Sequence, residues 1–151
     1  MFRFILKETD EYDRLVEFMK PFGLEFDNDE AMGTEKVNNW KVVQEPDYLV
    51  GGIMLGKRKG YFYINGIAVD PPMRHTGIAT IMMKKAINEV KKQGGSEIWL
   101  VAKVPEFFRT LGFEDVEPER APEIFGCLNC QQFGESCHPV IMKLDIIRQD
   151  K

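Results

Sequence analysis

The sequence is short of the features that mark three large classes of protein. Its 151 residues hold no apolar run near the roughly 20 residues that cross a bilayer, so no membrane association is predicted. Only three cysteines are present, an odd number that fits a reducing compartment better than a disulfide framework. Positive charge is not in excess, because the formal net charge is −4 at pH 7, and a nucleic-acid partner therefore has no electrostatic support.

The N-terminal segment also lacks the pattern of a secretion signal. MFRFILKETD contains an apolar patch that is too short for such a signal, and no small-residue cleavage site follows it. We therefore expect a cytoplasmic protein. What the chain does have is 44% hydrophobic residues, enough for a packed core, and a length typical of one domain, which we place at residues 1–151.

One stretch, from Tyr61 to Gly95, organises the expected fold. Tyr61–Val69 is rich in aromatic and β-branched residues, which predicts a strand. Asp70-Pro71-Pro72 ends this strand, because two successive prolines remove two backbone donors. A helix with one apolar face is then expected to begin near Thr76 and to end at Gly94-Gly95.

The junction between this strand and this helix carries the clearest chemical signal. Arg74-His75-Thr76-Gly77-Ile78-Ala79 places unpaired backbone N–H groups at a helix N-terminus, where the helix dipole adds partial positive charge. Gly77 allows an anion to approach the backbone, and Arg74 offers a forked guanidinium suited to phosphate oxygens. These residues predict a diphosphate site. An ordinary capped helix after a tight turn is the alternative, and the residues alone leave both interpretations open.

Strand-like segments before and after the central stretch predict a mixed sheet. They are Phe2–Lys7, Trp40–Gln44, Tyr48–Leu55, Glu97–Ala102, Phe113–Val116 and Val140–Ile147. Because Glu97–Ala102 follows the helix, the strand–helix–strand order is typical of a parallel pair with a right-handed crossover. Gly51-Gly52 inside a strand marks a bulge or a close backbone approach.

The connecting segments carry weaker sequence patterns. Thr9 and Asp10 are expected to cap a first helix. Residues 24–39 are acidic, which favours a solvated loop with a short helix, although a wall of a substrate site is the functional alternative. Lys57-Arg58-Lys59 predicts an exposed hairpin tip, with contact to a phosphate as the alternative.

Two segments resemble the GNAT superfamily of N-acetyltransferases. I-A-V-D-P-P-M-R-H-T-G-I-A is similar to its signature, Arg/Gln-x-x-Gly-x-Gly/Ala, and F-F-R-T-L-G-F is similar to its later helix-and-strand motif. The resemblance implies an α/β (α+β) single-domain fold, with a mixed, twisted central sheet of about six to seven strands flanked by helices. It also implies an enzyme, a transferase that moves an acetyl group from acetyl-coenzyme A (acetyl-CoA) to an amine.

The resemblance implies the site residues as well. The diphosphate falls to Arg74–Ala79, and the pantetheine arm pairs with Ile67, Ala68 and Val69, where a backbone N–H can steady the oxyanion. The residues expected to bind the cofactor are therefore Ile67, Ala68, Val69, Arg74, His75, Thr76, Gly77, Ile78, Ala79 and Phe108.

The proton donor of this chemistry is not evident. Phe108 stands where many members carry a tyrosine that protonates the departing thiolate, and phenylalanine cannot donate. Tyr61 and Tyr63 are the candidate catalytic substitutes on the central strand. The plainer interpretation of both tyrosines, which we favour, is cross-strand aromatic packing.

The cysteines suggest a metal or a redox pair. Cys127 and Cys130 have the spacing of a metal knuckle, and Cys137 follows. A structural zinc is one interpretation, and three reduced thiols are the other, which we favour. The cysteines before an apolar last strand also resemble a GNAT branch similar to N-acetylglutamate synthase, which suggests an amino-acid-like acceptor.

Three functions remain in view. The leading one is an N-acetyltransferase for a small-molecule amine, with direct attack in a ternary complex. A coenzyme A (CoA) or metal-sensing module without turnover is the second, and a protein-lysine or N-terminal acetyltransferase is the third. A homodimer is expected only because dimers are common in the family.

Overall fold

A seven-stranded mixed sheet is the framework of this computed structural model, which describes residues 4–22, 35–74, 76–102, 104–122, 124 and 140–146. The strand order is β1-β2-β3-β4-β5-β7-β6, and β4 runs parallel to β5 while the other neighbours are antiparallel. The strands are β1 (Phe4–Glu8), β2 (Glu35–Gln44), β3 (Tyr48–Arg58), β4 (Tyr61–Val69), β5 (Glu97–Ala102), β6 (Glu114–Asp115) and β7 (Val140–Asp145).

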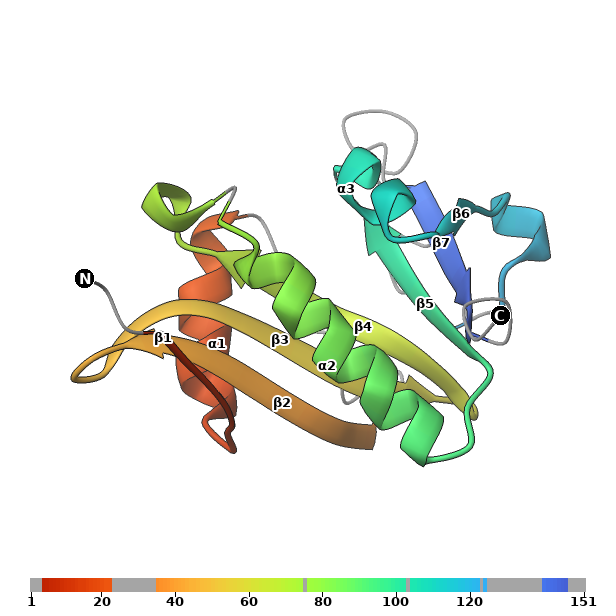
Figure 1. The fold of residues 1–151 in the computed structure, drawn as a ribbon. Helices are drawn as coiled ribbons and strands as arrows, with labels where there is room; N and C mark the ends of the chain where they lie inside the picture. The colour runs from red at the N-terminus through yellow and green to blue at the C-terminus, as the bar shows by residue number, and fades with distance from the viewer. Residues whose placement is uncertain are drawn as a thin grey trace.

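Helices cover both faces of the sheet, which confirms the expected fold class (Figure 1). The α-helices are α1 (Tyr12–Met19), α2 (Ile78–Lys92) and α3 (Pro105–Thr110), and the single turns of 3₁₀ helix are η1 (Lys20–Phe22), η2 (Pro71–Met73) and η3 (Pro118–Arg120). Since β4, α2 and β5 follow one another and the two strands are parallel, the predicted strand–helix–strand unit is present.

The glycine pair in β3 explains how two helices approach one strand from opposite sides. A Cβ on Gly51 would lie 3.2 Å from the Ile78 side chain of α2, and a Cβ on Gly52 would lie 2.7 Å from the Leu15 side chain of α1. Successive residues of a strand point to opposite faces, so each glycine leaves room for a different helix. The expected close approach is confirmed, and the register also shifts beside Gly51, between Val42 and Val43.

Three local expectations are wrong. Arg58 is not at an exposed hairpin tip: it is the last residue of β3 and only 5% exposed, because its Nη1 donates to the Ile124 carbonyl at 2.6 Å. Residues 35–39 are not loop but the start of β2, since their backbone pairs with β3. The helix α1 has Glu11 at its N-cap, while the Thr9 hydroxyl accepts from the Glu11 N–H at 3.1 Å.

Candidate functional site

The strands β4 and β5 separate along most of their length. Their only register pair is Tyr63 with Trp99, near the start of each strand, and from there the two strands diverge (Figure 1). A bulge accompanies the divergence: Leu55 of β3 faces Ile64 and Met54 faces Gly66, so Asn65 is the extra residue. The second half of β4 therefore has a neighbour on the β3 side and an open edge on the β5 side.

The open edge exposes the peptide groups of Ile67 and Val69. The Asp70 N–H donates to the Val50 carbonyl of β3 at 2.8 Å, which fixes the alternation of this antiparallel pair. Residues one and three positions earlier, Val69 and Ile67, then direct their N–H and C=O groups away from β3, towards the gap. Ala68 instead packs under α1 with Leu15 and Met19. The edge thus has the form that an extended, amide-containing chain can pair with.

The N-terminus of α2 lies at the end of this edge, after the η2 turn. Gly77 is the N-cap, with φ of +88° and no atom within 4 Å of an added Cβ. The first bond of the helix runs from the Ile81 N–H to the Gly77 carbonyl at 3.0 Å, and no side chain caps the end. Because the first N–H groups of a helix have no intrahelical partner, those of Ile78 and Ala79 are available to an anion.

Arg74 lies between the open edge and the helix. Its Nε donates to the Val69 carbonyl at 3.2 Å, and its Cζ lies 5.1 Å from the centre of the Phe22 ring. Thr76 is also engaged locally, because its hydroxyl donates to the Met73 carbonyl at 2.5 Å. The arginine is therefore held in place shortly before the N-terminus of α2, and within the described part of the chain the rest of its guanidinium donors have no hydrogen-bond partner.

The candidate catalytic tyrosines lie at the other end of β4. Tyr63 is 3% exposed, packs with Trp99 and Ile124, and has the Arg58 guanidinium 4.5 Å from its ring centre. Tyr61 is 37% exposed and meets Trp99 edge to face, with 6.4 Å between the ring centres. The structure places both tyrosines against Trp99, so they are not brought together with Gly77 and the open edge.

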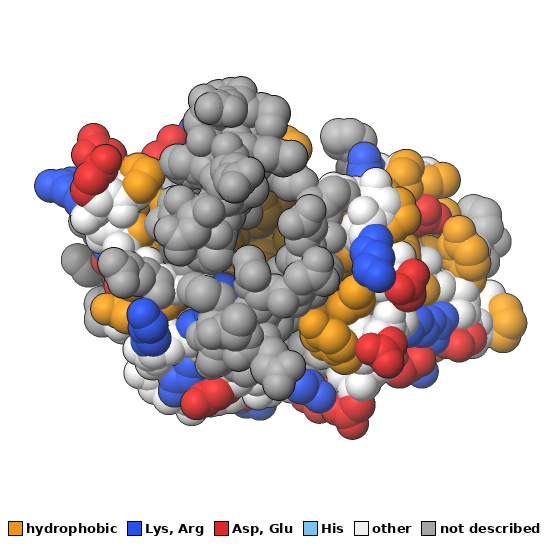
Figure 2. Space-filling model, turned by 180° about the vertical axis from the view of Figure 1, so that it is seen from behind, with side chains coloured by type: hydrophobic (Ala, Val, Ile, Leu, Met, Phe, Trp, Pro, Cys, Tyr) orange, Lys and Arg blue, Asp and Glu red, His pale blue; other side chains and the backbone are white. Residues whose placement is uncertain are grey.

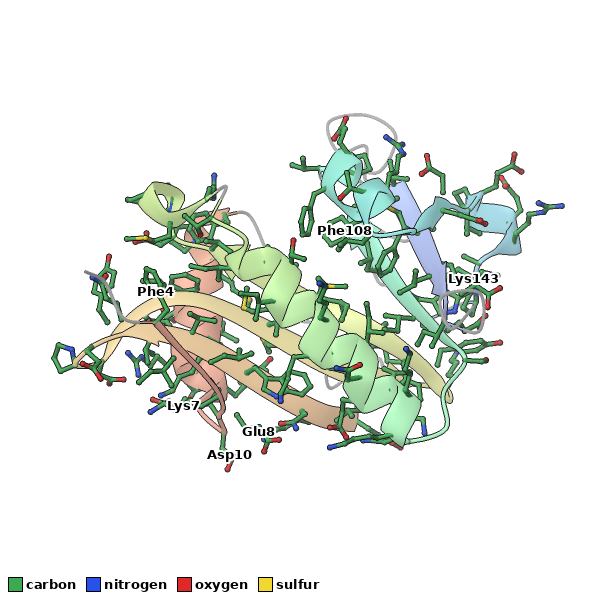
Figure 3. The ribbon with its side chains drawn as sticks, viewed as in Figure 1. Phe4, Lys7, Glu8, Asp10, Phe108 and Lys143 are labelled. Carbon is green, nitrogen blue, oxygen red and sulfur yellow. The ribbon has the colours of Figure 1, made fainter. Side chains whose placement is uncertain are left out.

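Phe108 is part of the core. It is 9% exposed and packs edge to face with Phe107 and Phe113, at 5.1 and 5.8 Å between ring centres. It lies beneath α3, on the side that faces α2 (Figure 3), in the same apolar cluster as the α2 side chains. The ring can form an apolar wall beside the gap, but it has no proton to give.

Several predicted residues fall outside the described residues. His75, Cys127, Cys130 and Cys137 are among them, so their proposed roles stay predictions. Within the part of the chain that the structure describes, no group of three or more His, Cys, Asp or Glu side chains is placed to hold a metal ion. No helix in that same part has the length and apolar character needed to cross a membrane.

Two contributors to the site were missed by the sequence reasoning. The bulge at Asn65 had a signal, because Asn65-Gly66 interrupts a run of strand-forming residues with a pair typical of turns. Phe22 had none, since its contact with Arg74 depends on how α1 lies against the sheet.

A second polar region lies at the start of α1, away from the diverging strands. A depression of about 460 Å³ is lined there by residues that include Asp10, Glu11 and Lys41. Lys41 pairs with Glu11, and Lys36 pairs with Asp10 at 2.6 Å. Hydrogen bonds from Lys41, Thr9 and Arg14, in decreasing order, lower the pKa of Glu11 to about 2. These charges satisfy one another, so the depression is an ion-pair cluster that holds α1 on the sheet.

The described surface on the face turned away from α2 also mixes charges of both signs (Figure 2). Figure 2 shows the molecule from behind, where acidic and basic side chains are interspersed over the described part of the surface.

Comparisons with known proteins agree with this geometry. The model of the acetyltransferase (GNAT) family matches residues 4–113. No curated protein matches the sequence. A GNAT-family acetyltransferase from Staphylococcus aureus Mu50 has a similar fold, with a TM-score of 0.71 and 16% identity over 95% of this chain and 99% of that one.

Two further solved structures are similar, and both were determined with CoA. N-acetylglutamate synthase from Neisseria gonorrhoeae, complexed with CoA and N-acetyl-glutamate, gives a TM-score of 0.70 and 13% identity, covering 95% of this chain but 35% of that one. An aminoglycoside 6′-N-acetyltransferase complexed with CoA gives 0.65 and 18%, over 94% and 97% of the two chains. At these identities the likeness concerns the fold.

Proposed function

Because the chain belongs to the acetyltransferase (GNAT) family, we propose that it transfers an acetyl group from acetyl-CoA to the amine of a small molecule. The observation that carries the proposal is that the open edge of β4 leads to the N-terminus of α2, which no side chain caps. Both present backbone N–H groups that a ligand can pair with. We further propose that residues 1–151 form one domain for this activity. β7 lies between β5 and β6, so the C-terminal part shares the sheet of the matched region.

The residues present fit the phosphate end of acetyl-CoA. Gly77 leaves open space where any other residue would carry a Cβ, and the amides of Ile78 and Ala79 lie at the positive end of the α2 dipole. Arg74 adds a full positive charge beside them. Two negative charges of a diphosphate would therefore meet matched donors at this turn.

The open edge of β4 fits the amide-containing arm. Pantetheine carries two amide groups, which can pair with the peptide groups of Ile67 and Val69 as a further strand would. The Val69 carbonyl already accepts from Arg74. The Val69 N–H and the N–H and C=O groups of Ile67 are therefore the groups we expect to pair with pantetheine. A backbone N–H on this edge can also stabilise negative charge on the thioester oxygen during attack.

The reaction we propose is direct attack in a ternary complex. The amine nitrogen bonds to the thioester carbon, the carbon–sulfur bond breaks, and the sulfur leaves as a thiolate. An ammonium substrate loses two protons overall and the thiolate takes up one, so one proton is released per turnover. Phe108 cannot supply the thiolate proton, which we expect to come from solvent.

The acceptor class is the finer part of the proposal. A small-molecule amine, with an amino acid first among those to test, is suggested by the sequence pattern of the C-terminal region. A protein lysine or N-terminus is the alternative acceptor, and a CoA-binding module without turnover is the alternative function, because Phe108 stands where a proton donor is common.

The test combines binding with turnover. Isothermal calorimetry of the folded protein with acetyl-CoA and with free CoA should give one site. Thiol release should then exceed background hydrolysis with at least one amine from a panel of amino acids, polyamines and peptides. Heat without release for any amine would favour the binding module. The absence of heat with either ligand would refute the proposed site.

A further inference from the structure

Arg74 is held on two sides by groups that come from different parts of the chain. On one side its Nε donates to the Val69 carbonyl, at 3.2 Å, on the open edge of β4. On the other side the face of the Phe22 ring lies 5.1 Å from its Cζ. Phe22 ends η1, which follows α1 directly, so the helix on the opposite face of the sheet supplies this contact.

We propose that Phe22 is a positioning residue for the guanidinium that binds the diphosphate, an inference that rests on the proposed function. Among the described residues, the Nε bond and the ring are the contacts of this guanidinium, and the Nη groups of Arg74 remain as donors for phosphate oxygens. A cation over an aromatic face is attracted by the ring quadrupole, so the ring selects one orientation of a long, flexible side chain. Ordering the arginine before the ligand arrives lowers the entropy that binding must remove.

Phe22 is itself well supported. It packs edge to face with Phe18, at 5.8 Å between ring centres, and against the cluster that contains Leu15 and Met19 beneath α1. The contact is thus anchored to the core rather than to a free surface. Through it, α1 contributes to the binding of the phosphate end although no α1 side chain lies at the Gly77 turn.

If Phe22 positions Arg74, its loss should weaken only ligands that carry the diphosphate. If Phe22 only packs in the core, its loss should affect all ligands alike. Phe22→Leu should raise the dissociation constant for CoA by about two- to five-fold, the range that an exposed cation–π contact implies. Binding of pantetheine, which has the same arm but no diphosphate, should be unchanged. Phe22→Tyr and Phe22→Trp keep an aromatic face and should restore the affinity for CoA. With an accepted amine, KM for acetyl-CoA should rise while kcat stays the same.

A double-mutant cycle and a spectroscopic signal complete the test. In an Arg74→Ala background, Phe22→Leu should have no further effect on CoA affinity. The Nε–H resonance of Arg74 should lie upfield in the wild type because of the ring current and should move downfield in Phe22→Leu. Phe62→Leu is the matched control, since it removes a ring that lies 4.8 Å from a lysine Nζ at the other end of β4.

These measurements decide whether Phe22 positions Arg74. Equal losses for CoA and pantetheine, or a loss that persists without Arg74, would overturn the role of Phe22 as a positioning residue. Wild-type affinity in Phe22→Leu would do the same and would leave the proposed function intact. A wild-type protein that binds no CoA would instead remove the proposed function and this inference together.

Discussion

The two ends of β4 differ in how they meet β5. At the first end Tyr63 pairs with Trp99 of β5, and both side chains are buried with Ile124 and Ile141. At the second end the strand loses its β5 partner after the bulge at Asn65. The β5-facing edge of β4 is therefore covered by packing at the start of the strand (the closed end) and unpaired at its end (the open end).

The difference shows how a sheet can contain an open strand edge in its interior rather than at its rim. An unpaired strand edge costs stability and invites aggregation when it lies at the rim of a sheet. Here the open edge is internal, flanked by α2 and by the diverging β5, and the closed end supplies the burial that holds the two strands together. The comparison predicts that stability and binding can be changed separately by substitutions at the two ends.

The largest effect on stability is expected at the closed end. Trp99→Ala removes a side chain that is 5% exposed and that packs against Tyr61 and Tyr63, so the free energy of unfolding should fall by about 3–5 kcal/mol. Urea denaturation monitored by circular dichroism measures this. The dissociation constant for CoA, measured well below the melting temperature, should stay within about two-fold of wild type. A matching loss of affinity would mean that the two ends are not independent.

The largest effect on binding is expected at the open end. Gly77→Asp places a carboxylate where the diphosphate would lie, so the dissociation constant for CoA should rise by at least about 100-fold through like-charge repulsion. Aspartate tolerates a left-handed backbone better than most residues, and its charge suits a helix N-terminus. The melting temperature should therefore change little, which is the reverse of the Trp99→Ala result.

Two controls isolate the charge in that experiment. Gly77→Asn has the same shape and the same tolerance of positive φ without the charge, so it should lose affinity only by the steric part, and the further loss in Gly77→Asp measures the repulsion. Gly60→Asp makes the same substitution at φ of +84° in an equally open position on the β3–β4 turn, and it should leave binding unchanged. A loss as large for Gly77→Asn as for Gly77→Asp would mean that steric exclusion or backbone strain, rather than repulsion, accounts for the effect.

Local patterns in the sequence located these elements well. The strand at Tyr61–Val69 and the strand at Glu97–Ala102 were predicted with the bounds that the structure has, because runs of aromatic and β-branched residues end at prolines and at glycines. The helix was expected near Thr76 and begins at Ile78, since Gly77 adopts a left-handed N-cap. The turn at Arg74–Ala79 was located because it depends on consecutive residues, and its binding of an anion stays a proposal.

Features that depend on distant partners were not predictable. The burial of Arg58 requires the Ile124 carbonyl, which the sequence does not place beside it. The strand at residues 35–39 is polar, and only its pairing with β3 makes it a strand. The contact between Phe22 and Arg74 joins segments from opposite faces of the sheet. In each case tertiary contacts override the local preference on which the prediction rested.

A smaller effect on turnover is expected from the buried tyrosine of the closed end. Tyr63→Phe should keep kcat within about three-fold, whereas removal of a residue that carries a proton in the reaction costs about 10²–10⁴-fold. The ring contact with Arg58 would remain, but loss of the hydroxyl should lower stability by about 1 kcal/mol. Steady-state rates of thiol release measure the first quantity. A fall in kcat beyond about 100-fold, with unchanged KM, would instead identify Tyr63 as a proton carrier.

The smallest effect is expected where α1 meets the edge of the sheet, remote from both ends of β4. The pKa of Glu11 is about 2 in the folded protein, below its ordinary value of 4.5, chiefly because Lys41 donates to it. The unfolded chain therefore binds a proton in this interval that the folded protein does not, and stability falls as the pH drops from about 4.5 to about 2. Glu11→Gln should remove this part of the pH dependence in thermal melts between pH 2 and 6. Glu17→Gln, which breaks an exposed ion pair on the same helix, should leave this pH dependence in place.

The affinity for CoA at pH 7 should be the same in both variants. The ion pairs fix α1 at its first turn, whereas Phe22 contacts Arg74 beyond the last turn of α1. Reduced affinity in Glu11→Gln alone would show that the position of α1, and not only the ring of Phe22, sets the geometry of the open end.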